Sequence, residues 1–192
     1  MVVFVLYVKA DLVGIDSVSL VNGTNLCISV RNPLNDYEIR EKVVIEASVL
    51  EEQEPKHPND HTYREPVCHF AVKWEGDTKR STIQVLGKTE GEAAAATRRT
   101  SKKGISKARS HSTNLVTTRD MTTQDSGEFV PMLSLECHGV EPYAFHPMSD
   151  EFIVTNKAGV KFDGPDLSAG AWNEYDLGSG TTSISNLEFK FM

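Results

Sequence analysis

The sequence has few cysteines and no long apolar run. Only three of its 192 residues are cysteines: Cys27, Cys68 and Cys137. They are far apart and odd in number, and each lies in an apolar stretch, so we expect buried free thiols in a reducing compartment rather than a disulfide framework. No apolar stretch approaches the ~20 residues that a membrane-spanning helix needs. The N-terminal run MVVFVLYV lacks a basic leading region and stops at Lys9, so it predicts a strand rather than a signal peptide.

Motifs of the common enzyme classes are also absent. The sequence contains no nucleophile elbow, phosphate-binding loop, dinucleotide fingerprint or His-Glu-x-x-His motif. Cys137 and His138 are adjacent on a predicted strand, so their side chains face opposite sides and cannot form a nucleophile–base pair. We therefore expect no catalytic residue and no enzymatic activity.

The balance of charge disfavours two classes of partner. The formal net charge is −7 and the isoelectric point is near 5.4. A protein with this net charge repels phosphate groups, so we expect no association with anionic membranes and no general binding of nucleic acid. The sequence is typical of a cytoplasmic protein, for which a nuclear pool is the second expectation.

The sequence does contain many short strand patterns. Alternating apolar residues recur in about ten segments that are separated by turn residues. Asn22-Gly23 is a strong hairpin signal, because a type I′ turn needs positive φ at both of its central residues. The segment Phe129–Phe145 predicts a strand that breaks at Gly139. These patterns predict an all-β fold, an antiparallel sandwich or barrel-like arrangement.

The two ends of the chain share an order of elements. Each has a strand, a glycine followed by an aliphatic residue, and a second strand: 6–10, Gly14-Ile15 and 26–30 at one end, and 133–137, Gly139-Val140 and 152–154 at the other. A true repeat predicts two similar β units, related by an approximate two-fold axis, that cover each other's apolar faces. The alternative is that any two β-hairpins share this pattern.

The segment 88–127 differs in character from the rest. It is rich in Ala, Thr, Ser and basic residues and has almost no large apolar side chains. Such a segment cannot bury enough surface to offset its ordering entropy. We therefore predict a single β domain over residues 1–192, with a core formed by 1–87 and 128–192 and a disordered, low-complexity, basic insertion at 88–127.

The basic run in this insertion suggests regulation. Residues 98–109 contain six Lys or Arg and no acid. Thr100 and Ser101 follow two arginines, which suits a basophilic kinase, and a phosphate there would cancel local charge. Thr100 and Ser101 are thus candidate phosphorylation sites, and 98–109 is where we expect any weak binding of nucleic acid or any nuclear import. The alternative is a solvated loop without a role.

A set of unusual residues late in the chain carries a family resemblance. The set comprises Leu135–Pro142, Phe145, Pro147, Phe162, Asp166-Leu167 and Trp172–Asp176. Together with the N-terminal strands and Lys9-Ala10-x-Leu12, it resembles the eukaryotic CXXC-motif-containing zinc-binding protein family. The resemblance leaves out the insertion. It implies a small, intracellular, poorly characterised β protein.

The resemblance also implies two Cys-x-x-Cys knuckles that hold one tetrahedral zinc. The positions expected for the four cysteines hold Arg31 and Leu34 (Asn32 and Asn35 in the neighbouring register), Trp74 and Asp77. Neither knuckle retains a cysteine, and one Asp alone cannot hold the ion. We therefore expect no metal ligand at these positions and no cofactor. We hypothesise that Trp74 packs against Leu34 and that Arg31 forms an ion pair with Asp77.

A relocated metal site is a second interpretation, based on His57, His61, Cys68 and His69. Nearby prolines argue against the helix that a His57–His61 ligand pair needs, and Cys68 and His69 point to opposite faces of a strand. Scattered loop histidines and a core cysteine are the simpler interpretation. The sequence thus predicts a non-enzymatic module that binds a protein partner and has lost the family's structural zinc. The alternative is a metal-handling protein with a site elsewhere.

Overall fold

The computed structural model describes residues 1–51, 67–87, 116–176 and 180–192. Within these ranges the chain forms strands and one short 3-10 helix, and no α-helix. The elements are β1 (Val2–Val13), β2 (Ile15–Leu20), β3 (Asn25–Asn32), β4 (Asn35–Glu46), β5 (Phe70–Val72), β6 (Ser81–Leu86), β7 (Met121–Thr122), η1 (Thr123–Asp125), β8 (Val130–His138), β9 (Glu141–Phe145), β10 (Phe152–Asn156), β11 (Lys161–Asp163), β12 (Trp172–Asp176) and β13 (Gly180–Phe191).

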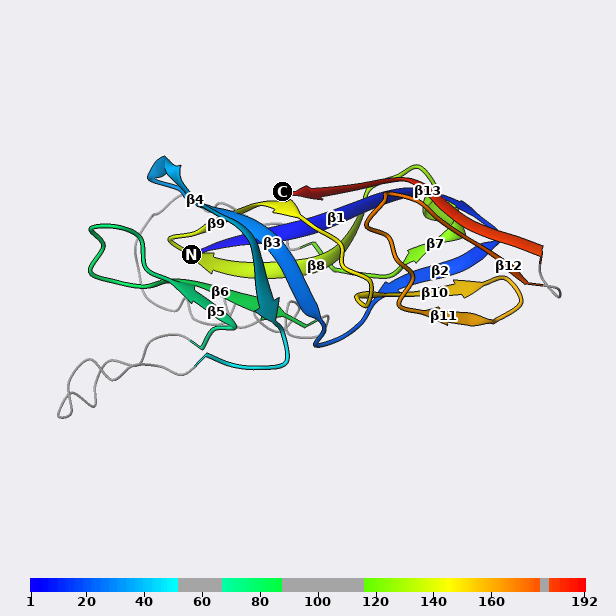
Figure 1. The fold of residues 1–192 in the computed structure, drawn as a ribbon, viewed down its shortest axis with the longest axis horizontal. Coiled ribbons are helices and arrows are strands. Elements are labelled where there is room, and N and C mark those ends of the chain that lie inside the picture. The colour runs from blue at the N-terminus through cyan, green and yellow to red at the C-terminus, as the bar shows by residue number, and fades with distance from the viewer. Residues whose placement is uncertain (52–66, 88–115, 177–179) are drawn as a thin grey trace, which may run out of the picture.

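The strands form three antiparallel sheets. The largest has the order β12-β13-β1-β8-β6-β5, the second β11-β10-β2-β7 and the third β4-β3-β9. The long strands β1, β8 and β13 run along the length of the molecule, with β3, β4 and β9 toward one end and β2, β10 and β11 toward the other (Figure 1). The prediction of an all-β, antiparallel fold is confirmed.

The pairing of the strands has the predicted two-fold arrangement. We call β1–β6 the first unit and β8–β13 the second unit. β1 and β8 pair at the centre of the large sheet, with β13 and β12 beyond β1, and β6 and β5 beyond β8. β2 pairs with β10 as β9 pairs with β3, and β11 joins β10 as β4 joins β3. If each strand of one unit is replaced by the corresponding strand of the other, the same pairings therefore result. Each unit ends in a hairpin, and the last strand of this hairpin pairs with the first strand of the other unit.

The glycine breaks lie at equivalent places in the two units. Gly14 has a φ of 69° and Gly139 a φ of 67°, in the left-handed region that side chains disfavour. A Cβ at Gly14 would lie 2.5 Å from the carbonyl oxygen of Thr181, and one at Gly139 would lie 2.5 Å from Oγ of Ser81. Each break thus brings the backbone close to the final hairpin of a unit, and only glycine fits without displacement.

The core lies between the sheets and is filled from both units. β1 directs Leu6, Val8 and Ala10 inward, as their alternation predicts. The rings of Phe145, Phe152 and Phe189, from β9, β10 and β13, form a cluster in which their centroids are 4.9 to 6.4 Å apart. Burying one such apolar side chain stabilises the fold by about 1.5–3 kcal/mol, so the interleaved units stabilise each other.

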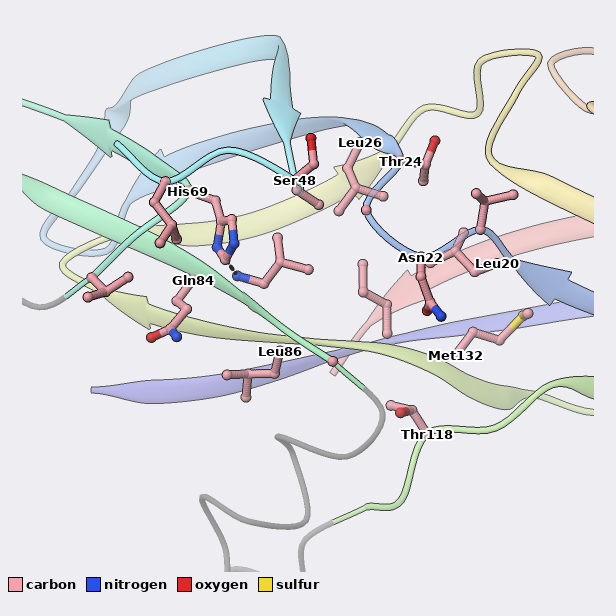
Figure 2. A pocket seen from close by; sticks show the side chains of 18 residues that line it. Leu20, Asn22, Thr24, Leu26, Ser48, His69, Gln84, Leu86, Thr118 and Met132 are labelled. Atoms are coloured by element: carbon pink, nitrogen blue, oxygen red, sulfur yellow. Dashed lines mark hydrogen bonds between the residues drawn. The ribbon is translucent and has the colours of Figure 1, made fainter. Parts of the chain in front are cut away.

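A cleft of about 730 Å³ opens between the large sheet and the start of β3. Its lining comes from β6 and β8, from the turn between β2 and β3, and from the residues after β4 (Figure 2). Among the described strands, β5 pairs with β6 only over Ser81–Ile83, so no described strand continues beside the rest of β6 on this side. The cleft therefore results from the arrangement of the sheets, and no local sequence pattern predicts it.

Part of the predicted disordered insertion is folded, which corrects its boundary. Residues 116–127 lie within the described ranges, β7 pairs with β2, and Met121 is only 1% exposed. The predicted boundary at Gly127 is therefore wrong. The remainder, 88–115, lies outside the described residues, together with Thr100, Ser101 and the basic run 98–109.

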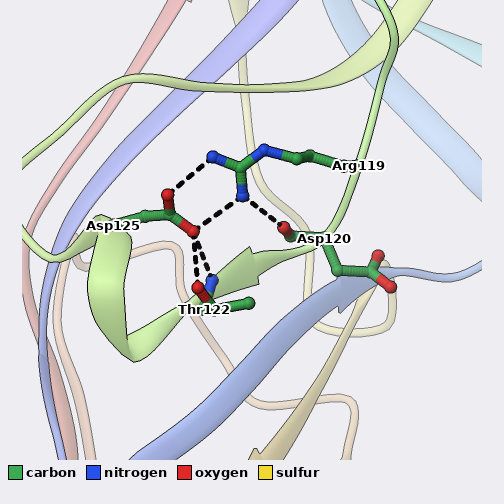
Figure 3. Close-up of polar contacts among 4 residues, drawn as sticks. All are labelled: Arg119, Asp120, Thr122 and Asp125. Carbon is green, nitrogen blue, oxygen red and sulfur yellow. Dashed lines mark hydrogen bonds and ion pairs between the residues drawn. The ribbon is translucent and has the colours of Figure 1, made fainter.

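Hydrogen bonds hold this segment in place where apolar side chains are few. The guanidinium of Arg119 donates to both carboxylate oxygens of Asp125, at 2.6 and 2.7 Å. Asp125 Oδ2 also accepts from the amide and the hydroxyl of Thr122, at 2.8 and 2.7 Å (Figure 3). Ser126 Oγ then accepts the amide of Leu12 on β1. Charged and polar contacts thus supply the stabilisation that composition alone did not predict.

Candidate functional site

The two turns expected to carry zinc knuckles are both tight turns. At the β3–β4 turn, Asn32 is buried and its Oδ1 accepts the amide of Leu34 at 2.9 Å. At the β5–β6 connection, the amide of Asp77 donates to the carbonyl of Trp74 at 3.2 Å, and Gly76 supplies the positive φ. Local hydrogen bonds therefore close both turns.

A carboxylate on β4 connects these turns. Glu38 Oε2 accepts from the side-chain amide of Asn32, and Glu38 Oε1 accepts the backbone amide of Glu75 at 3.0 Å. The two oxygens of one side chain thereby join two segments about 40 residues apart in the sequence. Sequence reasoning missed Glu38, because its role depends on two partners from different hairpins.

Trp74 fills the space behind these turns. Its side chain is 2% exposed, and its Nε1–H donates to the carbonyl of Gly139 at 2.9 Å. The guanidinium of Arg40 lies 5.5 Å from the centroid of the Trp74 ring, within range of a cation–π contact. Trp74 thus links the first unit to the glycine break of the second.

The contacts hypothesised for this position are wrong in detail. Leu34 is 91% exposed, so it does not cover Trp74. Arg31 forms its ion pair with Glu141 on β9, at 2.8 Å, in place of the expected pair with Asp77. The second error has a clear cause: β3 and β9 are neighbours in the third sheet, and this pairing places Glu141 directly opposite Arg31.

The residues at the knuckle positions do not fit a zinc ion. Leu34 has no donor atom and points to solvent, and the only indole nitrogen of Trp74 carries a proton that is donated to Gly139. Asp77 remains as the one plausible ligand, and tetrahedral zinc in proteins needs at least three. In the described part of the chain, no group of three or more His, Cys, Asp or Glu residues is arranged to hold a metal ion.

The three cysteines are buried free thiols, as expected. Burial raises the pKa of the Cys137 thiol to about 12, and the charge of Glu136 adds to the effect. Burial also raises the pKa of Cys27. A thiol with a raised pKa is a poor nucleophile at neutral pH. The thiols therefore behave as core residues.

The interpretation of a relocated metal site at His57, His61, Cys68 and His69 stays untested, because the structure describes only two of these residues. His57 and His61 lie outside the described residues. Cys68 is buried, and Nδ1 of His69 accepts the amide of Val85 at 3.0 Å. The imidazole of His69 thus takes the place of a strand partner along the outer edge of β6.

A buried serine–histidine contact is a further feature that the sequence did not reveal. Oγ of Ser29 on β3 lies 2.7 Å from Nε2 of His146, which follows β9. The amide of Lys42, which has a φ of 52°, donates to the same hydroxyl at 3.1 Å. Ser29 is 2% exposed, so its hydroxyl is closed to solvent and holds together the irregular part of β4. Lys42 is 13 positions and His146 is 117 positions from Ser29 in the sequence, and no local motif connects the three residues.

Comparison with known proteins decides the family. The chain matches the eukaryotic family described as CXXC motif containing zinc binding protein, over residues 5–192. The chain belongs to this family. The family's description records a motif and a metal but no reaction. The resemblance seen in the sequence is therefore confirmed.

Individual proteins are also similar to this chain, in sequence or in fold. UPF0587 protein CG4646 of Drosophila melanogaster is 35% identical over 68 residues, which cover 35% of this chain and 41% of that protein. The matched region thus spans less than half the length of this relative. A hypothetical protein from Plasmodium falciparum has a similar structure, with a TM-score of 0.72 at 19% identity over the full length of both chains. The crystal structure of C1orf123 has a TM-score of 0.72 at 16% identity, covering 100% of this chain and 99% of that one. These two structures share the fold of this chain.

None of the helices in the described ranges is long and apolar enough to cross a membrane.

Proposed function

We propose that this chain is a non-enzymatic module that binds a protein partner through the tip of its β3–β4 hairpin. The observation that carries the proposal is the exposure of two apolar side chains at this tip. Leu34 is 91% and Tyr37 is 96% exposed. The end of this hairpin projects from the body of the molecule (Figure 1). A projecting pair of apolar residues suits insertion into a pocket on another protein.

The surroundings of the tip fit the same purpose. Ile39 on β4 adds a third exposed apolar side chain, and Arg40 and Glu41 follow it as exposed charged residues. An apolar centre with a charged rim is the usual composition of a protein–protein interface. The hydrogen bonds of Asn32 hold the base of the tip, so little order has to be gained on binding.

Loss of the family's zinc is the second part of the proposal. The bridge that Glu38 forms between the turns supports it, because the bridge connects the two segments that a zinc ion would otherwise connect. Metal analysis of the purified full chain tests this part, and we expect no stoichiometric zinc. One zinc per chain would contradict it and would favour the alternative, a metal-handling protein with a site away from the family knuckles. We place the protein in the cytoplasm on the basis of its composition.

Affinity purification from the native cell tests the binding surface. We expect the double variant Leu34→Ser, Tyr37→Ser to lose captured proteins that the native chain retains. Tyr175→Ser is the matched control, because Tyr175 is 66% exposed on β12 in the second unit. If the double variant captures the same proteins as the native chain, the hairpin tip is not the binding surface.

A further inference from the structure

We propose that the cleft beside β6 binds a neutral small molecule with a largely apolar body and one polar group, the class represented by isoprenoid alcohols. This site is separate from the hairpin tip. Its volume of about 730 Å³ is within the range of about 300–1,000 Å³ that small-molecule sites occupy. The chemistry of the lining restricts the ligand further.

The floor of the cleft is apolar. Leu26 from β3, Leu86 from β6 and Leu133 from β8 are all buried side chains that line it, and Met132 lies beside them. They belong to different strands, so the floor is a preformed part of the packed core. An apolar ligand that covers such a floor gains about 25 cal/mol for each Å² of apolar surface removed from water.

The described residues that line the cleft include no Asp, Glu, Lys or Arg, although these types make up 24% of the chain. His69 is the one side chain among them that can carry a positive charge. Its Nδ1 accepts the amide of Val85, so that nitrogen carries no proton and the imidazole is uncharged in this arrangement. A ligand with a phosphate, carboxylate or ammonium group would lose hydration here without meeting an opposite charge. The lining therefore selects against charged ligands.

Polar groups without charge lie around the mouth of the cleft. They are the side-chain amides of Asn22 and Gln84 and the hydroxyls of Thr24, Ser48 and Thr118, which come from separate segments of the chain (Figure 2). Amides and hydroxyls both donate and accept hydrogen bonds. They suit a single hydroxyl or carbonyl group at the end of an apolar body, which can then exchange hydrogen bonds with these amides and hydroxyls.

A fluorescence titration of the full chain tests the proposal. The probe is N-phenyl-1-naphthylamine, which is neutral and fluoresces in apolar surroundings. Farnesol and farnesyl diphosphate then compete for the site, since they share one apolar chain and differ in charge. We expect farnesol to displace the probe at least about tenfold more effectively than the diphosphate, equivalent to about 1.4 kcal/mol. Equal competition, or no probe binding, would overturn the proposal.

Two variants locate the site. Ser48→Trp places a large ring at the mouth, and Gln84→Glu adds a charge to the lining with almost no change of shape. We expect about tenfold weaker probe binding for the first and several-fold weaker binding for the second. Ser168→Trp and Gln124→Glu are the matched controls, because both residues are exposed and lie outside the cleft. Thermal melting shows whether each variant folds. If the folded cleft variants bind like the controls, the proposal is wrong.

Discussion

The two units solve the same structural problem at equivalent turns. Asn32 is the last residue of β3 in the first unit, and Asn156 is the last residue of β10 in the second. Both side chains are buried, and each Oδ1 accepts backbone amides of the turn that follows: Leu34 for Asn32, and Ala158 and Val160 for Asn156. A turn of the first unit, where the family's description leads one to expect metal ligands, is closed by the same device as its counterpart in the second.

The units differ in what supports these turns. In the first, Trp74 is fully buried and donates to Gly139, and Glu38 connects the two turns. In the second, Trp172 on β12 is partly exposed and packs edge-on against Phe162, with 5.2 Å between the ring centroids. The difference indicates that one buried aromatic residue supports the turns of the first unit, whereas several side chains share this role in the second.

Replacing each tryptophan in turn tests this difference between the units, and it should give the largest change in the free energy of unfolding. We expect Trp74→Ala to lower the free energy of unfolding by about 3–5 kcal/mol, because it leaves a cavity and removes the donor to Gly139. Trp172→Ala should cost clearly less, because its side chain is partly solvated. Urea denaturation measures both, and equal losses would remove the distinction.

The equivalent glycines provide a sharper comparison. Gly14→Ala should cost about 2–3 kcal/mol, because its Cβ meets the carbonyl oxygen of Thr181, which is backbone and cannot move alone. Gly139→Ala meets the hydroxyl of Ser81, so the double variant Gly139→Ala, Ser81→Ala should recover part of its loss. Ser81→Ala alone is the control. A double variant that is no more stable than Gly139→Ala would show that backbone conformation alone sets the cost.

The turn asparagines should differ by the number of amides that each satisfies. We expect Asn156→Ala to cost about 2–3 kcal/mol and Asn32→Ala about 1–2 kcal/mol, because two amides donate to the first side chain and one to the second. Thermal unfolding of the two variants checks the order. The reverse order would mean that the bridge from Asn32 to Glu38 contributes more than the turn itself.

β7 has no counterpart in the described part of the second unit. The loss of stability in acid tests how much the segment around β7 contributes to the free energy of unfolding. The hydrogen bonds from Arg119, and then those from Thr122, hold the pKa of Asp125 well below its usual range. The stabilisation is thus present above about pH 4, the usual value for Asp, and is lost as the pH falls through the lowered pKa. Asp125→Asn should cost about 1–2 kcal/mol at pH 7 and flatten the acid limb of a stability profile. An unchanged acid limb would contradict this account.

The loop between β9 and β10 should respond to pH in the opposite direction, with the smallest effect. Glu151 is buried, its Oε1 accepts the amide of Met148, and burial raises the pKa of its carboxyl. The stabilisation of the neutral form is present below about pH 4.3 and is lost as the pH rises through the raised pKa. Between pH 4 and 7 we expect Glu151→Gln to lose less stability than the native chain, by up to about 1 kcal/mol. Urea midpoints at several pH values measure the difference, and parallel profiles would exclude it.

Much of the fold follows from short patterns in the sequence. Alternating apolar residues predicted the strands, and Gly14 and Gly139, each followed by an aliphatic residue, marked the two-fold repeat. The absence of cysteine at the knuckle positions predicts the loss of the zinc site, and this stays a prediction until the metal content is measured. These features are local, or they recur at equivalent positions, so sequence alone carries them.

The contacts that complete the site are not local. Glu38 reaches Glu75 because the β3–β4 hairpin of the third sheet meets the β5–β6 hairpin of the large sheet, and Ser29 reaches His146 because β3 pairs with β9. The segment near β7 is an intermediate case. Its composition predicted disorder, yet the spacing of Thr122 and Asp125 is that of a capping box and was available as a signal. Composition fails where a few strong hydrogen bonds replace apolar burial.

The exchange of final hairpins between the units has a consequence for synthesis on the ribosome. β1 is translated before its two neighbours in the sheet, β8 and β13, which follow it far along the chain at Val130–His138 and Gly180–Phe191. The two edges of β1 therefore stay unpaired until β8 and then β13 have been translated. Such a nascent chain has mostly distant contacts and folds slowly, which makes it a natural client for chaperones.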